Sequence, residues 1–399
     1  MSRSYYRLAL VLGLISATGP FAIDMYLPAL PAIAADLHAS PAAVQMSLMV
    51  FFIASGSSQL LWGPAADVFG RKAPLYAGLV LYCIGGIGCA LAGNITALVG
   101  WRFVQGVGSA AGMSVPRAVV RDLYTGHEAA RLMSLLMLVF SVAPILAPMV
   151  GSLLVEFSGW RTVFWLVTGV GLIALAIAVW ALDETRSPAQ RTQASLGHVL
   201  AAYATLLRDR HFLGVSFIGA FGISTFFVYL ANSSFVLIEH FGLSTRGYAV
   251  AFAANAACFI GAAQFNGHLG QRLGLARLVR WGIAGCAGMM VVLCLLVLAG
   301  VDNVALMIGL MSLGFGCLGV VVPTSAVLAL EAHGARAGTA AALLGMLQLL
   351  TGAAVIAVVG LFLDGSAVPM AAGMAATSGT AFVLAWRTLR PRVAAALAS

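Results

Sequence analysis

Long apolar segments alternate with short polar ones along almost the whole chain. Each apolar segment has about 20 or more residues, which is enough for one helix to cross the hydrocarbon core of a bilayer. In chain order we predict spans at 8–28, 42–63, 74–93, 96–116, 130–154, 161–182, 212–237, 247–268, 277–299, 303–327, 339–361 and 368–387. The pattern predicts an all-α polytopic membrane protein with twelve transmembrane helices in two pseudo-symmetric six-helix bundles.

The longest polar interval separates the sixth span from the seventh. It runs over 183–211 and contains Pro188 and a stretch of Gln, Thr and Ser. We therefore expect an N-terminal six-helix bundle over 1–182, a cytoplasmic linker over 183–211 and a C-terminal six-helix bundle over 212–399.

A weak internal repeat supports this division into halves. A glycine-rich polar loop with basic residues follows the second span at 63–72, and a similar one follows the eighth span at 267–274. Parallel repeats of this kind occur in transporters whose substrate site lies between the halves near the bilayer midplane.

Composition strengthens the membrane assignment and excludes other classes. Hydrophobic residues make up 61% of the 399 residues and charged residues only 9%, whereas soluble domains carry about 25% charged residues. A water-soluble enzyme and a disordered chain are therefore excluded. The net charge of +8 is scattered and forms no patch, so we expect no nucleic-acid partner. The six cysteines lie in apolar runs without metal-ligand spacing, so we expect no metal.

The distribution of basic residues predicts the orientation. If both termini are cytoplasmic, nearly all of the 21 Arg and Lys residues fall on the cytoplasmic side, and only Arg161 and Arg246 fall outside. This asymmetry is what the positive-inside rule requires. Arg102 is left over, inside the fourth span. We expect a multi-pass protein of the bacterial inner membrane.

Several motifs resemble those of one transporter family. The loop Gly63-x-x-x-Asp67-x-x-Gly70-Arg71-Lys72 resembles the signature loop of the major facilitator superfamily, and Arg102-x-x-Gln105-Gly106 resembles its second motif. The resemblance covers nearly the whole chain and implies alternating access around a central cavity.

Other segments resemble the drug:proton antiporters of the bicyclomycin-resistance branch of that superfamily. They are Asp24-Met-Tyr-Leu-Pro28-Ala-Leu-Pro31, Arg121-Asp122-Leu and Gly338-Thr-Ala-Ala-Ala-Leu-Leu-Gly345. The resemblance implies export of small amphiphilic compounds such as amphenicol- or bicyclomycin-like antibiotics.

Asp24 and Arg102 are the candidate proton-coupling residues. An ionised carboxylate within a span costs about 2.5–3.5 kcal/mol, and a proton can neutralise it. Helical rise places Arg102 about 10 Å deep on the fourth helix, at a depth similar to that of Asp24. We predict that the two side chains pair, directly or through water. The alternatives are an interfacial Asp24 at a helix end and a static pair that only fixes helix packing.

A set of polar and aromatic residues at helical spacing is predicted to line the substrate cavity. The alternative for each is ordinary core packing between helices. The candidate substrate-binding residues are Tyr26, Phe52, Gln59, Arg102, Gln105, Ser109, Phe226, Tyr229, Asn232 and Gln348.

The signature loop is predicted to act in gating. Gly63 would permit a close approach of helices and Gly70 a tight turn. By the resemblance, Asp67, Arg71 and Asp122 hold the cytoplasmic ends together when the transporter faces outward. Lys72 and Arg121 lie on the same side. The alternative, ordinary positive-inside charge, accounts for Arg71 and Lys72 and leaves Asp67 unexplained.

Pro144 and Pro148 lie four residues apart in the fifth span, followed by Gly151. Each proline removes a helical hydrogen bond, so together they should bend the helix. The pattern is similar to the antiporter motif of the superfamily, although Ala143 and Ala147 stand where glycine is frequent. The resemblance implies a seal between the fifth and eighth helices; the alternative is a simple kink.

Together these features predict a proton-coupled secondary exporter, and not an enzyme. No glycine-rich phosphate loop with a lysine is present, so the proton gradient, without a cofactor, is the expected energy source. The expected partners are a small-molecule substrate, protons and the lipid bilayer, and we expect a monomer. The alternatives are a proton-coupled metabolite exporter and an importing symporter of the same fold, with a non-transporting receptor as a third.

Overall fold

The structure is a computed structural model that describes residues 3–124, 126–186, 196–331, 333 and 337–389. Every element in this part is a helix. One long helix lies on each predicted span. They are α1 (Arg3–Asp24), α3 (Pro41–Val68), α4 (Lys72–Ala90), α5 (Ile95–Leu123), α6 (Gly126–Ser158), α7 (Trp160–Ala181), α9 (Arg210–Ser234), α10 (Thr245–Ala263), α12 (Leu275–Leu298), α13 (Val304–Glu331), α14 (Ala337–Gly360) and α15 (Val368–Thr388).

Five short elements connect the long helices. The π-helix η3 continues α9, and α11 bends away from α10 by 47°. The short elements are the 3₁₀ helix η1 (Leu27–Ala29), α2 (Leu30–Asp36), α8 (Leu196–Arg208), η3 (Phe235–His240) and α11 (Asn266–Leu273).

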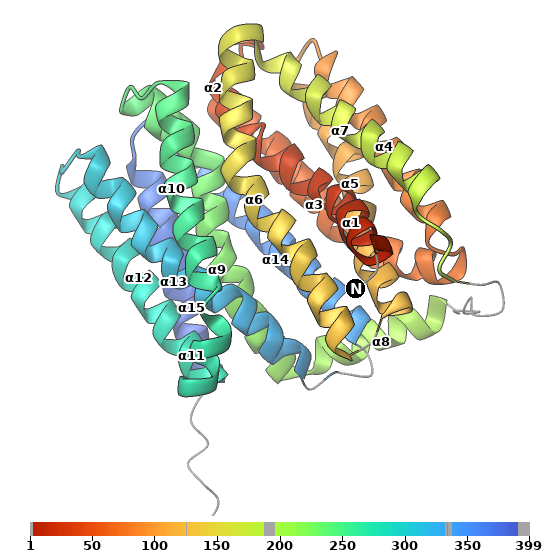
Figure 1. Cartoon of the computed structure of the whole chain (residues 1–399). Helices are drawn as coiled ribbons and strands as arrows, with labels where there is room; N and C mark the ends of the chain where they lie inside the picture. The colour runs from red at the N-terminus through yellow and green to blue at the C-terminus, as the bar shows by residue number, and fades with distance from the viewer. Residues whose placement is uncertain (1–2, 125, 187–195, 332, 334–336, 390–399) are drawn as a thin grey trace, which may run out of the picture.

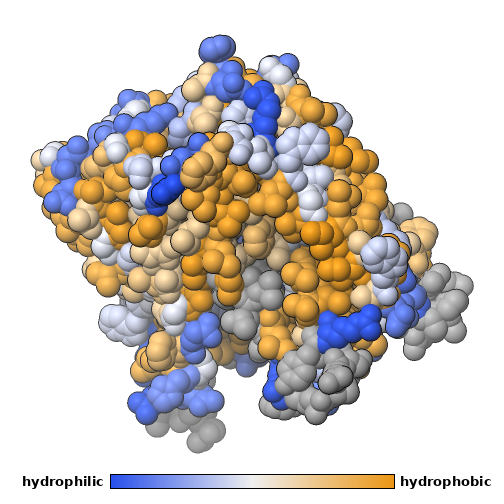
Figure 2. Space-filling model, turned by 45° about the horizontal axis from the view of Figure 1, so that its top comes forward, coloured by the Kyte–Doolittle hydropathy of each residue, from blue (hydrophilic) through white to orange (hydrophobic). Residues whose placement is uncertain are grey.

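The outer surface is suited to a bilayer. Within the described residues, nine helices are long and apolar enough to cross a membrane, and the bent pair of α10 and α11 makes a tenth. Figure 2 shows a broad hydrophobic surface, with hydrophilic residues gathered toward its edges. Large apolar side chains such as Trp180 (83% exposed) and Leu361 (82%) point outward, which in water would be an aggregation hazard and in lipid is not.

The long helices form two groups that meet along two seams. In the first half α3, α4 and α5 pack together, with α7 against α4 and α1 against α6; in the second half α9 packs against α13, α14 and α15. The seams are formed by α3 against α14 and by α6 against α10. In Figure 1, α6 and α14 accordingly lie between the two groups.

The first span differs from its prediction. Helix α1 ends at Asp24, and the chain continues through η1 and α2 to Asp36. Pro28 has no N–H group, so it cannot donate to the carbonyl group of Asp24, four residues earlier, as α-helix geometry would require. The break therefore falls at Asp24, and the apolar segment extends eight residues beyond the predicted end at 28.

The linker over 183–211 contains a helix that the sequence analysis did not anticipate. Residues 187–195, including Pro188, lie outside the described residues, but α8 follows them. Tyr203 and Leu206 on α8 are buried, and the helix packs against α9 and α14. Helix α8 lies at one end of the molecule and α2 lies at the other (Figure 1). We refer to the end with α8, α11 and Arg71 as the basic end.

Candidate functional site

Asp24 lies at the junction of the two halves. It ends α1 and is only 5% exposed. The following turn, η1, packs against α9 and α10 of the second half. Within the described residues, no hydrogen-bond donor or cation lies within bonding distance of its carboxylate. The interfacial alternative, a solvated Asp at a helix end, does not describe this position.

Arg102 is fully buried on α5 and has its own set of contacts. Its Nη1 group donates to the Ala22 carbonyl oxygen (3.1 Å) and to Gln105 Oε1 (2.7 Å). Its guanidinium lies over the rings of Phe51 (4.2 Å) and Tyr26 (4.7 Å). The Nε and Nη2 groups have no acceptor among the described residues. Aromatic faces therefore compensate part of the buried charge, and two donors remain unused.

The predicted direct pair between Asp24 and Arg102 is absent from this structure. Among the described residues, the ion pairs within 4 Å do not include either side chain. The depth estimate was sound, since Arg102 bonds a carbonyl oxygen only two residues before Asp24. Rise along a helix gives the height of a residue but not the direction of its side chain. The Arg102 guanidinium lies over the rings of Phe51 and Tyr26.

The predicted cavity face of α5 packs against neighbouring helices. Side chains of Gln105 and Ser109 are buried. A Cβ atom at Gly19 of α1 would lie 3.1 Å from Ser109 Oγ, and one at Gly85 of α4 would lie 2.5 Å from the Gln105 backbone nitrogen. Small residues thus let α1 and α4 approach α5 closely. This is the kind of helix packing that was named as the alternative to a cavity face.

Residues of the seam and the second half are equally enclosed. Gln45 Nε2 donates to Asn232 Oδ1 (3.0 Å) and thereby bridges α3 and α9, and Phe52 packs on Phe227 (4.7 Å between ring centres). Tyr26 and Tyr229 are fully buried. Two further predicted residues, Phe226 and Gln348, are half-buried.

Tyr229 belongs to an aromatic cluster with an unsatisfied polar interior. Phe226, Phe252 and Phe315 surround it at 5.2–6.0 Å between ring centres. Among the described residues, neither its hydroxyl nor the Nδ2 group of Asn255 has a hydrogen-bond partner. Buried donors of this kind suit a ligand or an ordered water. Asn255 belongs to no motif, so the sequence did not predict it.

A cavity of about 580 Å³ opens at the basic end. Among the predicted substrate-binding residues only Gln59 lines it. The predicted gate residues are better represented in its wall, which includes Gly63, Asp67, Arg71, Arg121 and Asp122. The open cavity therefore lies beside the predicted gate residues at the basic end, and most of the predicted substrate-binding residues lie outside its wall.

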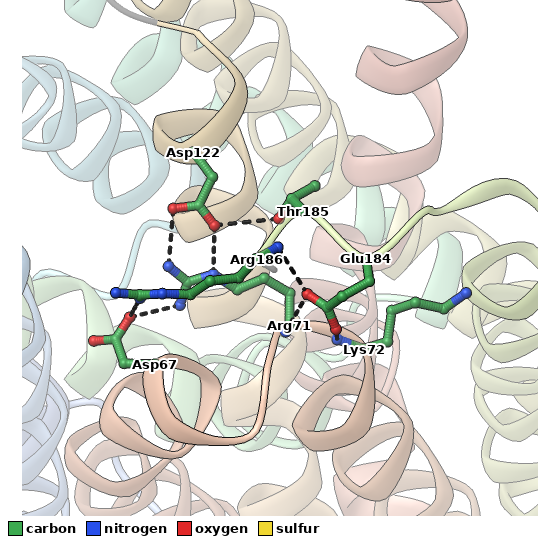
Figure 3. A network of polar contacts seen from close by, with 7 residues as sticks. All are labelled: Asp67, Arg71, Lys72, Asp122, Glu184, Thr185 and Arg186. Carbon is green, nitrogen blue, oxygen red and sulfur yellow. Dashed lines mark hydrogen bonds and ion pairs between the residues drawn. The ribbon is translucent and has the colours of Figure 1, made fainter. Parts of the chain in front are cut away.

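The predicted gate carboxylates and Arg71 form one network (Figure 3). Arg71 donates from Nη1 to Asp67 (2.8 Å), and from Nε and Nη2 to the two oxygens of Asp122 (2.6 and 2.9 Å). This side chain is only 4% exposed. It joins the end of α3, the start of α4 and the end of α5, all in the first half.

The segment that follows α7 completes this network and was missed. Glu184 accepts from the backbone N–H groups of Arg71 (2.8 Å) and Lys72 (3.1 Å) at the start of α4, where a helix has free donors and favours negative charge. Thr185 donates to Asp122, and Arg186 bonds Asp67. We call the set Asp67, Arg71, Asp122, Glu184, Thr185 and Arg186 the basic-end network.

Other residues of the predicted gate have separate positions. The Lys72 ammonium group lies over the Tyr76 ring (5.7 Å), outside the network, and Arg121 faces the cavity. The turn role of Gly70 is confirmed by its φ of +89°. The close approach predicted at Gly63 is wrong: a Cβ atom there would meet nothing within 4 Å, because Gly63 borders the cavity.

Helix α6 contains Pro144 and Pro148 and packs against α10. This contact joins the fifth and eighth spans, where the resemblance implied a seal. A Cβ atom at Gly151 would lie 2.2 Å from the Met25 carbonyl oxygen, so glycine lets α6 approach the turn after Asp24. Arg246 bonds Glu156 across the same seam (2.8 Å).

No cluster of three or more His, Cys, Asp or Glu side chains suited to a metal ion occurs in the described part of the chain.

Known proteins similar to this chain agree with the geometry. A profile of the Major Facilitator Superfamily matches residues 12–356. An uncharacterised MFS-type transporter, YdgK, from Bacillus subtilis is 36% identical over 93% of this chain and 92% of its own length. A bicyclomycin resistance protein homologue from Haemophilus influenzae is 30% identical over 92% of both chains. A chloramphenicol resistance protein from Pseudomonas aeruginosa is 29% identical over 66% of this chain and 62% of its own.

Solved structures show the same fold. A crystal structure of a D-xylose-proton symporter superimposes with a TM-score of 0.74, covering 96% of this chain and 97% of its own, at 17% identity. A partially occluded, inward-open xylose transporter from Escherichia coli gives 0.75 over 97% and 98%, at 15% identity. The chain therefore belongs to the major facilitator superfamily of transporters, as its motifs predicted, and it is not an enzyme.

Proposed function

We propose that this transporter is a proton-coupled exporter of small amphiphilic compounds, with Asp24 as its protonation site. The relatives named for resistance to bicyclomycin and chloramphenicol make antibiotics of these two classes the first substrates to test. The observation that carries the coupling is the placement of Asp24: a buried carboxylate at the junction of the halves, with no cation within bonding distance in the described residues.

This placement supports a cycle in which Asp24 holds the proton while the halves are closed around it. An ionised, unpaired carboxylate in a low-dielectric setting is costly, so burial favours the protonated form. Opening of the end opposite the basic end would hydrate the carboxylate and let it exchange its proton. A change of conformation and a change of protonation are therefore coupled at one residue.

The seams support export from the basic end. Glu156–Arg246 and Gln45–Asn232 join the halves on the far side of the cavity, while the cavity borders the basic end. The arginine distribution supports a cytoplasmic location for that end. A compound would then enter from the cytoplasm and leave after these contacts separate.

The test uses inverted membrane vesicles with an acidic interior. Adding bicyclomycin or chloramphenicol should collapse the pH gradient in vesicles with the wild-type chain. The collapse should be lost with Asp24→Asn and kept with Asp36→Asn, a matched change on an exposed aspartate that bonds Arg161 (2.7 Å). Collapse that persists in Asp24→Asn would move the proton site elsewhere. Collapse that requires the compound inside the vesicles would indicate symport.

A further inference from the structure

Two arginines on α5 line the cavity without a carboxylate partner. Arg117 and Arg121 lie four residues apart, on one helical face. All 13 Asp and Glu residues of the chain lie in the described ranges, and none of them lies within 4 Å of either guanidinium. The acids in the cavity wall, Asp67 and Asp122, are bonded to Arg71 instead.

The two guanidinium groups also oppose each other. Arg117 and Arg121 lie one helical turn apart in the wall of the same cavity. Like charges on adjacent turns destabilise a helix, and partial enclosure in a cavity reduces screening by water. An anion placed between them would relieve this repulsion.

The opposite wall of the cavity is electropositive as well. The first turn of α14 contributes Gly338 and Thr339 to the lining, and a Cβ atom at Gly338 would lie 2.7 Å from Arg121 Nη1. The N-terminus of a long helix favours negative charge. Arg121 and this helix end therefore favour the same kind of ligand group, an anion, in the space between the halves.

Further donors and an apolar wall define the rest of the site. Gln59 is only 4% exposed, lines the cavity and has no hydrogen-bond partner among the described residues. Ser114 adds a hydroxyl, while Met133 and Leu330 supply apolar surface. The volume of about 580 Å³ lies in the range of sites for drug-sized molecules.

We propose that Arg117 and Arg121 form an anion-binding subsite for the acidic group of an amphiphile, a carboxylate, sulfonate or phosphate. The apolar part of the ligand lies against Met133 and Leu330, and Gln59 contacts its middle. The ligand comes from either of two sources, an acidic export substrate or the head group of an anionic lipid. Only the first source rests on the proposed export function.

The test measures binding to the purified full chain in phosphatidylcholine nanodiscs. The probes are dansylglycine and its uncharged amide, dansylglycinamide. We expect the carboxylate to bind about tenfold more tightly than the amide, equivalent to about 1.4 kcal/mol. Arg117→Gln and Arg121→Gln should each remove most of this preference without changing amide affinity, which shows that the variants remain folded. Arg272→Gln, on an exposed arginine at the same end, should leave the ratio unchanged.

Equal affinities for the two probes in the wild type, or a ratio unchanged in both variants, would overturn the proposal. Adding phosphatidylglycerol to the nanodiscs separates the sources. Weaker dansylglycine binding in the wild type, but not in Arg117→Gln, identifies the lipid head group as the resident ligand. Unchanged binding, together with dansylglycine-driven gradient collapse in vesicles, identifies a substrate site. An export function that fails in vesicles would leave the binding ratio intact, so the two failures are distinguishable.

Discussion

The two charged regions of the molecule are built in opposite ways. In the basic-end network, Arg71 bonds both Asp67 and Asp122, so each of these three charges has an opposite charge beside it. Around Asp24, a region that we call the centre, Asp24 and Arg102 are both buried but do not bond each other. Among the described residues, the network thus pairs its carboxylates with arginines, whereas the centre has a carboxylate without a cation and two unused guanidinium donors.

The difference indicates which region stabilises one arrangement of the helices and which region responds to a proton. A paired network stabilises one arrangement and gains little from binding a proton. A lone buried carboxylate changes its energy strongly when it is protonated. We therefore assign positional stability to the basic-end network and proton coupling to the centre.

The largest expected effect comes from replacing Asp by Asn in each of the two regions, because one replacement should affect transport and the other stability. Asp24→Asn should lower the rate of drug-driven gradient collapse at least about tenfold. Its thermal stability should change little, because Asn resembles a protonated Asp. Asp122→Asn should instead lower the melting temperature, because it weakens the bonds to Arg71. Melting of both variants in detergent checks the contrast, and a large loss of stability in Asp24→Asn would contradict it.

The next effect concerns the stability of the basic-end network. Arg71→Gln should lower the free energy of unfolding by roughly 2 kcal/mol, because it leaves two carboxylates without their shared donor. Lys72→Gln is the matched control, since its side chain lies outside the network. Denaturation that is equal in the two variants would show that the network is not stabilising.

A smaller effect is expected at the other charge of the centre. Arg102→Lys keeps the charge but loses the planar guanidinium that lies over Phe51 and Tyr26 and whose Nη1 group bonds both Ala22 and Gln105. The initial rate of gradient collapse should fall about tenfold, or about 1.4 kcal/mol. Arg161→Lys, on a half-exposed side chain, serves as the control. A rate equal to that of the wild type would remove Arg102 from the coupling site.

The smallest effect concerns the carboxylate of Asp209, whose contribution to stability should follow its own ionisation. Asp209 caps α9, and the backbone N–H groups of Phe212 and His211 hold its pKa below the usual value. The cap stabilises the folded state when the pH lies above the pKa of an unfolded Asp, about 3.9. This contribution is lost as the pH falls through the lower pKa that Asp209 has in the folded state. Asp209→Ala should cost about 1 kcal/mol at neutral pH.

The melting temperatures of Asp209→Ala and the wild type should converge at strongly acidic pH. A difference that stays constant with pH would show that capping by the ionised carboxylate is not the cause.

The long helices were predictable because lipid imposes a simple rule on composition. Every span of about 20 apolar residues became a helix, since backbone groups in a bilayer must bond within their own segment. Pro28, four residues after Asp24, was a readable signal for the break in α1. The buried face of α8, with Tyr203 and Leu206, is a weaker signal and was hidden in a polar interval.

The candidate site was predictable only where its parts are close in sequence or in a known loop. Asp67 and Arg71 are four residues apart, so their contact follows from local geometry. Glu184 lies more than a hundred residues from its partners in α4, and only the packing of α7 brings it there. Side-chain direction could not be predicted either, so depth alone led to a direct Asp24–Arg102 ion pair that is absent among the described residues. A pair through water stays a prediction.

The central claim is that Asp24 carries a proton that substrate binding releases. Infrared difference spectra of the full chain in lipid, with and without bicyclomycin, report this directly through the carbonyl stretch of a protonated carboxyl group. We predict that bicyclomycin removes such a band from the wild type and that Asp24→Asn lacks the change. A band that is unaffected by the compound, or that persists in the variant, would contradict the claim.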